Sequence, residues 1–214
     1  MRKWILILGL LTSFHVKADV IAQGDDCGED CHWELSDDGA LTITGSGNMY
    51  DYDNLPSTYS HPTPWGQNIT SVSVSGLSSI GAYAFSYSDN LTSVSLSDSV
   101  TRISGAAFEK SKNVENIILP KDLTYIGGWA FFGLNNLNEI TIPENVSYIG
   151  KSAFADTGIT TLVLPETLFT EDAEGLSPKF LHHSKVTTIY CPETSVKCKE
   201  MNFQYQGQWD HLTQ

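Results

Sequence analysis

The sequence predicts an α/β solenoid, a stack of short coils that each contribute one strand to a parallel sheet on a concave face. Three observations predict it: Ala-Phe pairs recur 23 residues apart, isoleucines recur with the same spacing, and each unit opens with alternating apolar residues. A unit of this length cannot bury its apolar side alone, so successive units must stack to form a core. The 214 residues suffice for one such domain.

The first 18 residues have the layout of a secretory signal peptide. Arg2 and Lys3 precede an apolar run over residues 4–11, and Val16 and Ala18 place small residues before a cleavage point. The run is shorter than the about 20 residues that span a bilayer. We therefore expect residues 1–18 to be removed and the protein to be secreted or periplasmic, with no membrane insertion.

The chain is strongly acidic, with 25 Asp and Glu against 12 Lys and Arg and a formal net charge of −13. Residues 1–18 hold three of the basic residues and no acidic one, so the chain without them carries −16. No Lys or Arg occurs between Asp19 and Arg102. Such a surface repels phosphate backbones and anionic lipids, which makes nucleic acid an improbable partner.

Residues 19–68 are expected to form an N-terminal cap, which a solenoid needs to cover its first apolar layer. Within them, residues 33–44 alternate between apolar and polar on both sides of Asp38-Gly39. Alternation around such a dipeptide is typical of a β-hairpin. The cap is therefore predicted to be a β-hairpin fused to the array.

Residues 69–185 hold the repeats. In each unit the first, fourth and sixth positions are apolar, and the alternation of the last two is that of a short strand. In the second half, about one helical turn is expected, with glycine easing its entry, alanine letting coils approach and phenylalanine filling the layer between them. The Ala-Phe pairs are residues 84–85, 107–108, 130–131 and 153–154, and the isoleucines are Ile80, Ile103, Ile126 and Ile149.

Residues 186–214 are expected to form a C-terminal cap and a polar tail, after a break in the period that leaves room for a helical insertion at 170–176. Four cysteines form two close pairs, Cys27 with Cys31 and Cys191 with Cys198. In an exported chain this arrangement predicts two disulfides, one at each end. The spacings fit zinc sites poorly, and the C-x-x-C of redox catalysis is absent.

The repeats resemble the BspA-type leucine-rich repeat over roughly residues 69–165, since the units read as a strand followed by V-x-x-I-G-x-x-A-F. The segment from Cys27 to Met49 resembles the leader that often precedes such repeats. The sequence departs from the family where many repeats carry a cysteine, and has Ser88, Ser111, Leu134 and Thr157 there. The resemblance implies surface roles such as adhesion to matrix proteins or to other cells.

A binding surface is expected on the exposed strand positions, because solenoids bind on the concave face. These positions are hydroxyl-rich at the start of the array and more apolar towards its end, although Ser and Thr also suit any exposed strand. A protein, such as a matrix or cell-surface glycoprotein, or a glycan would be the partner. The candidate residues are Ser73, Ser95, Asn116, Ile118, Glu139, Thr141, Thr161, Val163, Thr188 and Tyr190.

No set of residues indicates an enzyme, a cofactor or a metal site. Motifs for phosphate loops, dinucleotides and nucleophile elbows are missing. Of the possible metal ligands, His182-His183 are adjacent and fit a solvated loop better, while Asp51 and Asp53 lack the calcium-loop pattern. The sequence therefore favours an exported, non-enzymatic protein-binding module. A carbohydrate-binding module and a structural or inhibitory partner of a secreted protein are the alternatives.

Overall fold

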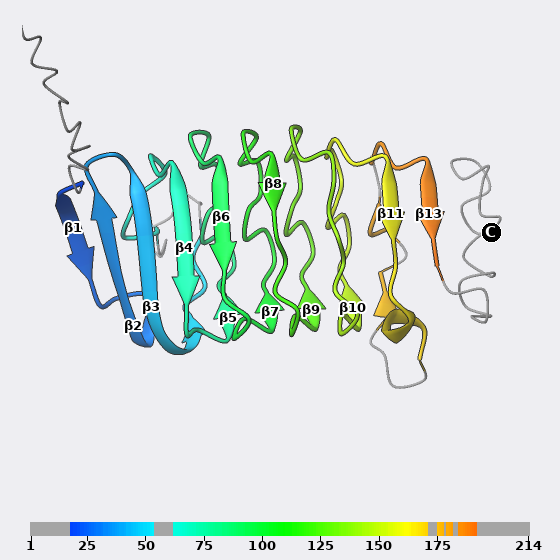
Figure 1. Cartoon of the computed structure of the whole chain (residues 1–214), viewed down its shortest axis with the longest axis horizontal. Coiled ribbons are helices and arrows are strands. Elements are labelled where there is room, and N and C mark those ends of the chain that lie inside the picture. The colour runs from blue at the N-terminus through cyan, green and yellow to red at the C-terminus, as the bar shows by residue number, and fades with distance from the viewer. Residues whose placement is uncertain (1–17, 54–61, 171–174, 178, 182–183, 192–214) are drawn as a thin grey trace, which may run out of the picture.

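The protein is an elongated β-solenoid of about five turns, with the coils side by side along its long axis (Figure 1). The computed structural model describes residues 18–53, 62–170, 175–177, 179–181 and 184–191. The predicted signal peptide and most of the predicted C-terminal cap and tail lie outside these residues. Within them, no helix is long and apolar enough to cross a membrane.

Two rows of parallel strands run along the array (Figure 1). The first row comes from the strand positions that the repeat predicts, and alternate side chains point inward. It contains β4 (Ser71–Ser75), β6 (Ser93–Leu96), β8 (Asn116–Ile117), β11 (Thr161–Val163) and β13 (Thr188–Tyr190). The second row was not predicted and is made by the repeated isoleucine and the residue before it. It contains β5 (Ser79–Ile80), β7 (Arg102–Ile103), β9 (Tyr125–Ile126), β10 (Tyr148–Ile149) and β12 (Gly175–Leu176).

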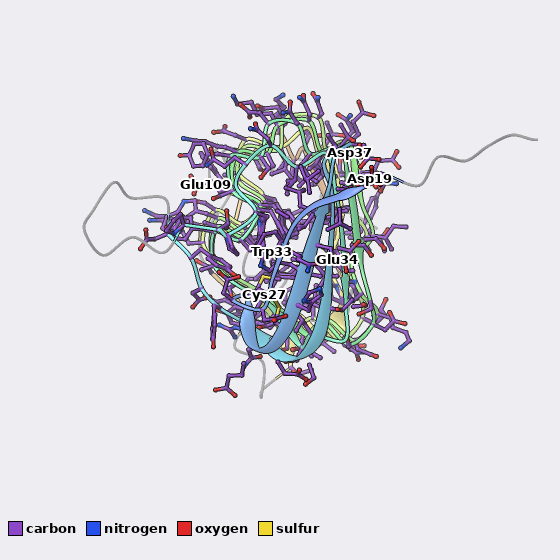
Figure 2. The ribbon with its side chains drawn as sticks, turned by 90° about the vertical axis from the view of Figure 1, so that its left-hand side faces the viewer. Asp19, Cys27, Trp33, Glu34, Asp37 and Glu109 are labelled. Carbon is purple, nitrogen blue, oxygen red and sulfur yellow. A yellow bond between two sulfur atoms is a disulfide. The ribbon has the colours of Figure 1, made fainter. Side chains whose placement is uncertain are left out.

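Three longer strands lie at the N-terminal end of the array: β1 (Val20–Gly24), β2 (Gly28–Ser36) and β3 (Ala40–Met49). β2 and β3 pair antiparallel around a turn in which Gly39 has a φ of 85°. β3 also pairs parallel with β4 and with β5, so one sheet runs without a break from these strands into the repeats. In the end-on view, Trp33 and Cys27 lie toward the middle of the cross-section (Figure 2).

A column of stacked rings forms the centre of the core. It contains the repeated phenylalanines, which are at most 1% exposed, and neighbouring ring centroids lie 5.2 to 5.8 Å apart. Trp65 ends the column at the N-terminal side by stacking on Phe85, and its Nε1 donates to the carbonyl of Ala84. Such packing fills the layer between coils, as the repeat predicts.

The α part of the predicted fold class is wrong, because the second half of each unit is a series of turns and not a helical turn. The residue before each Ala-Phe pair has a left-handed φ of 55° to 57°, and the described residues contain only a short 3-10 helix, η1 (Glu166–Phe169). Because each coil contains a residue in the left-handed conformation, a right-handed helix cannot continue through it. These residues are Tyr83, Ala106, Trp129 and Ser152.

The repeated glycine serves close approach between coils, not the entry into a turn. A Cβ on Gly127 would lie 2.6 Å from the backbone nitrogen of Gly105, and one on Gly150 would lie 2.3 Å from that of Gly128. Contacts this short with backbone force the coils apart, since neither side can rotate away. Only glycine therefore allows the second row of strands to pair at these positions.

The fifth coil keeps both rows in spite of its irregular sequence. Leu176 pairs with Ile149 and so takes the place of the repeated isoleucine. Phe180 accepts a hydrogen bond from the backbone of Phe154, as Ala153 does from Phe131, and Leu181 beside it is 3% exposed. The helical insertion expected at residues 170–176 falls largely on residues 171–174, outside the described residues, and its last two residues, Gly175 and Leu176, form strand β12 and not helix.

Cys27 and Cys31 form a disulfide at the N-terminal end, with their Cα atoms 5.3 Å apart. Both side chains are buried and belong to the same hydrophobic core as Trp33. The predicted bond between Cys191 and Cys198 lies outside the described residues, because Cys198 is not among them.

Candidate binding surface on the strand face

The outward side of β3, β4, β6, β8, β11 and β13, together with residues 137–143 between β8 and β11, forms one surface along the molecule, here called the strand face. Its side chains alternate with core residues, so their exposure follows from the pleat of the strands. Nine of the predicted binding residues are exposed, and Thr188 is half-buried. The structure thus brings the predicted residues onto one surface.

The C-terminal half of the strand face is apolar and uncharged at its centre. Val163 and Tyr190 are neighbours in register on β11 and β13, and they are 58% and 47% exposed. Ile118 is 76% exposed and lies one coil beyond Thr141, which separates it from Val163. Exposed apolar side chains gathered on one face mark interaction surfaces more often than scattered ones do.

The ladder of the first row is interrupted between β8 and β11. The repeat predicts a short strand around its fourth and sixth positions, here Ile140 and Ile142, but the structure has none, and residues 138–142 make no backbone hydrogen bond to either neighbouring coil. Ile140 is half-buried, whereas the matching residues of the adjacent coils, Ile117 and Leu162, are buried. The coil is therefore less tightly packed at this point and leaves its peptide groups unpaired.

A groove accompanies this interruption. One hollow of about 370 Å³ has mainly apolar walls, among them Ile117, Ile118 and Ile140, and its lining also includes Lys121. A second hollow of about 660 Å³ adjoins it and shares Asn116 and Glu139. The second hollow is more polar, and the rest of its lining is Glu115, Asn136 and Asn138.

The N-terminal half of the strand face carries hydroxyls instead. Thr42, Ser73 and Ser95 lie in register on β3, β4 and β6, and a second row joins Thr44 to Ser75. Thr42 and Thr44 were missed by the sequence analysis, which assigned them to the cap. The alternation within residues 40–44 could have found them had β3 been aligned with the repeat strands.

A charged group borders these hydroxyls on β2. Nδ1 of His32 lies 2.6 Å from Oδ1 of Asp25, and its Nε2 lies 3.6 Å from a carboxylate oxygen of Glu34. The hydrogen bond to Asp25, supported by Glu34, raises the pKa of His32 above its usual 6.5. Glu34 pairs with Thr42 across the sheet, and His32 pairs with Thr44. Charged side chains therefore border the strand face at this edge.

The side chains of the strand face can supply hydrogen bonds and apolar contacts to a ligand. Among the described residues, no group of three His, Cys, Asp or Glu side chains could hold a metal ion. Of the candidates from the sequence, Asp51 accepts a hydrogen bond from the backbone N–H of Ala82 through its carboxylate, and His182 and His183 lie outside the described residues. The strand face combines exposed hydroxyls, amides and apolar side chains, which supply hydrogen bonds and contact area.

Known proteins share the fold of this chain, and a family model matches its repeats. Residues 65–174 match the model of the BspA type leucine rich repeat region in six copies. A leucine-rich repeat protein of Eubacterium ventriosum is 24% identical with a TM-score of 0.68, over 80% of this chain and 44% of its own. A leucine-rich repeat protein of Treponema pallidum is 22% identical with a TM-score of 0.50, over 74% of this chain and 78% of its own. No curated protein matches.

A leucine-rich cell surface protein of Faecalibacterium prausnitzii shares the fold more distantly, with 16% identity and a TM-score of 0.50 over 77% of this chain and 53% of its own. The chain thus spans less than half of the Eubacterium protein. At these identities the structures show the fold alone, while the family model covers just over half of the 214 residues. The chain belongs to the BspA-type leucine-rich repeat family.

Proposed function

We propose that this protein is an exported, non-enzymatic module that binds a protein on the C-terminal half of its strand face. The observation that supports this most is the exposed pair Val163 and Tyr190, in register on β11 and β13, on the same strand face as the groove lined by residues within 116–121 and 139–143. The family is associated with protein binding and adhesion, which agrees with such a role. Export rests on the signal-peptide pattern of residues 1–18.

Apolar anchors supply the contact energy in this proposal. Ile118, Val163 and Tyr190 expose large side chains, and full burial of one such side chain contributes about 1.5–3 kcal/mol. Tyrosine is enriched among the residues that carry most binding energy, because it combines a large rigid area with a hydroxyl. A partner that covers these three side chains would therefore gain most of its binding free energy from Tyr190 and from Val163 beside it.

The unpaired backbone between β8 and β11 can orient a bound peptide segment. Residues 138–142 offer N–H and C=O groups that no neighbouring coil bonds, and extended peptide segments bind such groups by adding strand-like hydrogen bonds. Glu115 and Glu139 line the adjoining hollow, so a segment with a basic residue fits better than an acidic one. We therefore expect an extended segment of a matrix or cell-surface glycoprotein as the partner.

The test is binding of the purified protein to an immobilised panel of matrix and cell-surface glycoproteins, before and after enzymatic removal of their glycans. Val163→Asp with Tyr190→Asp should lower affinity at least about tenfold, since two buried charges cost more than one tenfold step of 1.4 kcal/mol. Tyr50→Asp with Tyr87→Asp adds the same charge at two exposed side chains outside the strand face and serves as the matched control.

Saturable binding that survives glycan removal, and that only the Val163/Tyr190 variant loses, supports the proposal. Equal loss in both variants would point to overall charge and contradict a local site. Absence of binding to every panel protein would also contradict it, provided that circular dichroism shows folded protein.

A further inference from the structure

We infer that the N-terminal half of the strand face is a second binding site, for an extended neutral polysaccharide. It concerns residues other than the proposed protein site and does not depend on it. The site consists of the hydroxyl grid, defined as Thr42 and Thr44 on β3, Ser71, Ser73 and Ser75 on β4, and Ser93 and Ser95 on β6.

The grid is regular because its three strands are parallel and in register. Thr42 pairs with Ser73 and Ser73 with Ser95, while Ser71 pairs with Ser93. Neighbouring strands lie about 4.8 Å apart and alternate residues about 6.6 Å apart along a strand. The rows run along the long axis of the molecule (Figure 1), so a ligand with a repeating unit can meet the same group on each strand.

The hydroxyls of the grid are free to bind. None of the seven has a hydrogen-bond partner within the described part of the chain, and six of them are exposed, with Ser71 half-buried. Hydroxyls on other sides of the coils are used differently: Thr70 donates to Asp38, and Thr92, Thr101 and Thr124 donate to carbonyls of the preceding coil. The grid therefore keeps both its donors and its acceptors for a ligand.

The chemistry of the grid selects the class of ligand. It contains no charged and no large apolar side chain, and serine is under-represented among the residues that anchor protein partners. Sugar hydroxyls both donate and accept, as the grid hydroxyls do. A formal net charge of −13 repels anionic polysaccharides. Glu34 on one border and Asn116 on the other add a carboxylate and an amide to the rows, and these groups also bond sugar hydroxyls.

The experiment measures binding of the full-length protein to insoluble cellulose, chitin and β-1,3-glucan by depletion from solution. One variant combines Thr42→Val, Ser73→Ala and Ser95→Ala, which removes one complete row of hydroxyls with little change in shape. Its matched control combines Thr141→Val, Thr161→Val and Thr188→Val, which removes as many hydroxyls from the other half of the strand face. Melting temperatures of both variants check that they fold.

We expect wild-type protein to bind at least one of these polysaccharides, and the row variant to bind it at least about tenfold more weakly, because the variant lacks three hydroxyls that hydrogen-bond the ligand. The control variant should bind as the wild type does. Binding to none of the three polysaccharides, equal binding by the row variant, or an equal loss in the control would each overturn the inference.

Discussion

The ring of Phe131 lies over the ring of Phe108 with centroids 5.8 Å apart and planes 9° from parallel. Phe154 stacks on its other side at 5.5 Å, so Phe131 belongs to the interfaces of three consecutive coils. Each coil of a solenoid contacts only its neighbours, so stability is approximately a sum of such interfaces. The ring column is therefore where a single truncation should be felt most.

Phe131→Ala should lower the free energy of unfolding by about 3–5 kcal/mol, because it removes buried area and leaves a cavity. Phe132→Ala deletes the same side chain one residue later, where it is half-buried, and should cost clearly less. Urea denaturation followed by circular dichroism measures both. Equal losses for the two variants would contradict a core centred on the ring column.

Gly127→Ala should destabilise the protein by about 1–3 kcal/mol, the usual cost of forcing extra atoms into a packed core. Its Cβ would meet backbone atoms of Ser104 and Gly105 at 2.6 Å. Gly105→Ala is the matched control, since its Cβ would meet only the carbonyl oxygen of Gly128, at 3.3 Å. Thermal denaturation of the two variants should rank them in this order, and the reverse order would be inconsistent with the close approach of the coils.

Arg102 and Tyr125 should stabilise the second row by cation–π contact. The guanidinium carbon of Arg102 lies 3.5 Å from the ring centroid of Tyr125, which itself stacks on Tyr148 at 4.6 Å. A double-mutant cycle with Arg102→Gln and Tyr125→Leu should give a coupling free energy of about 0.5–1 kcal/mol at this exposed site. A coupling near zero would show that the two side chains act independently.

His32 should titrate above 6.5 in the folded protein, because its hydrogen bond to Asp25 favours the charged ring. A raised pKa makes the contribution of this pair to stability complete below 6.5 and diminishing as the pH rises through the folded value. Two-dimensional NMR of the imidazole measures the pKa directly. Asp25→Asn should bring it down, and an unchanged value in that variant would disprove the role of the carboxylate.

Much of the fold could be predicted from local patterns. Alternation such as Ser-Val-Ser-Val at residues 71–74 places valine in the core and serine outside whatever the neighbouring coils do, because alternate residues of a strand face opposite sides. The exposed residues of the strand face followed from the same rule. The second row of strands did not, since two residues such as Tyr125–Ile126 are too short to show a period.

The sequence by itself determined that this protein is a stack of coils, since a 23-residue period of apolar residues has no other way to bury its core. Tertiary structure alone decided three features. They are the left-handed turns in place of helix, the missing backbone hydrogen bonds at residues 138–142, and the pairing of Thr42 with Ser73 in one row of hydroxyls. Each depends on how closely neighbouring coils approach and which backbone groups they pair. That contact lies between units, and no pattern within one unit encodes it.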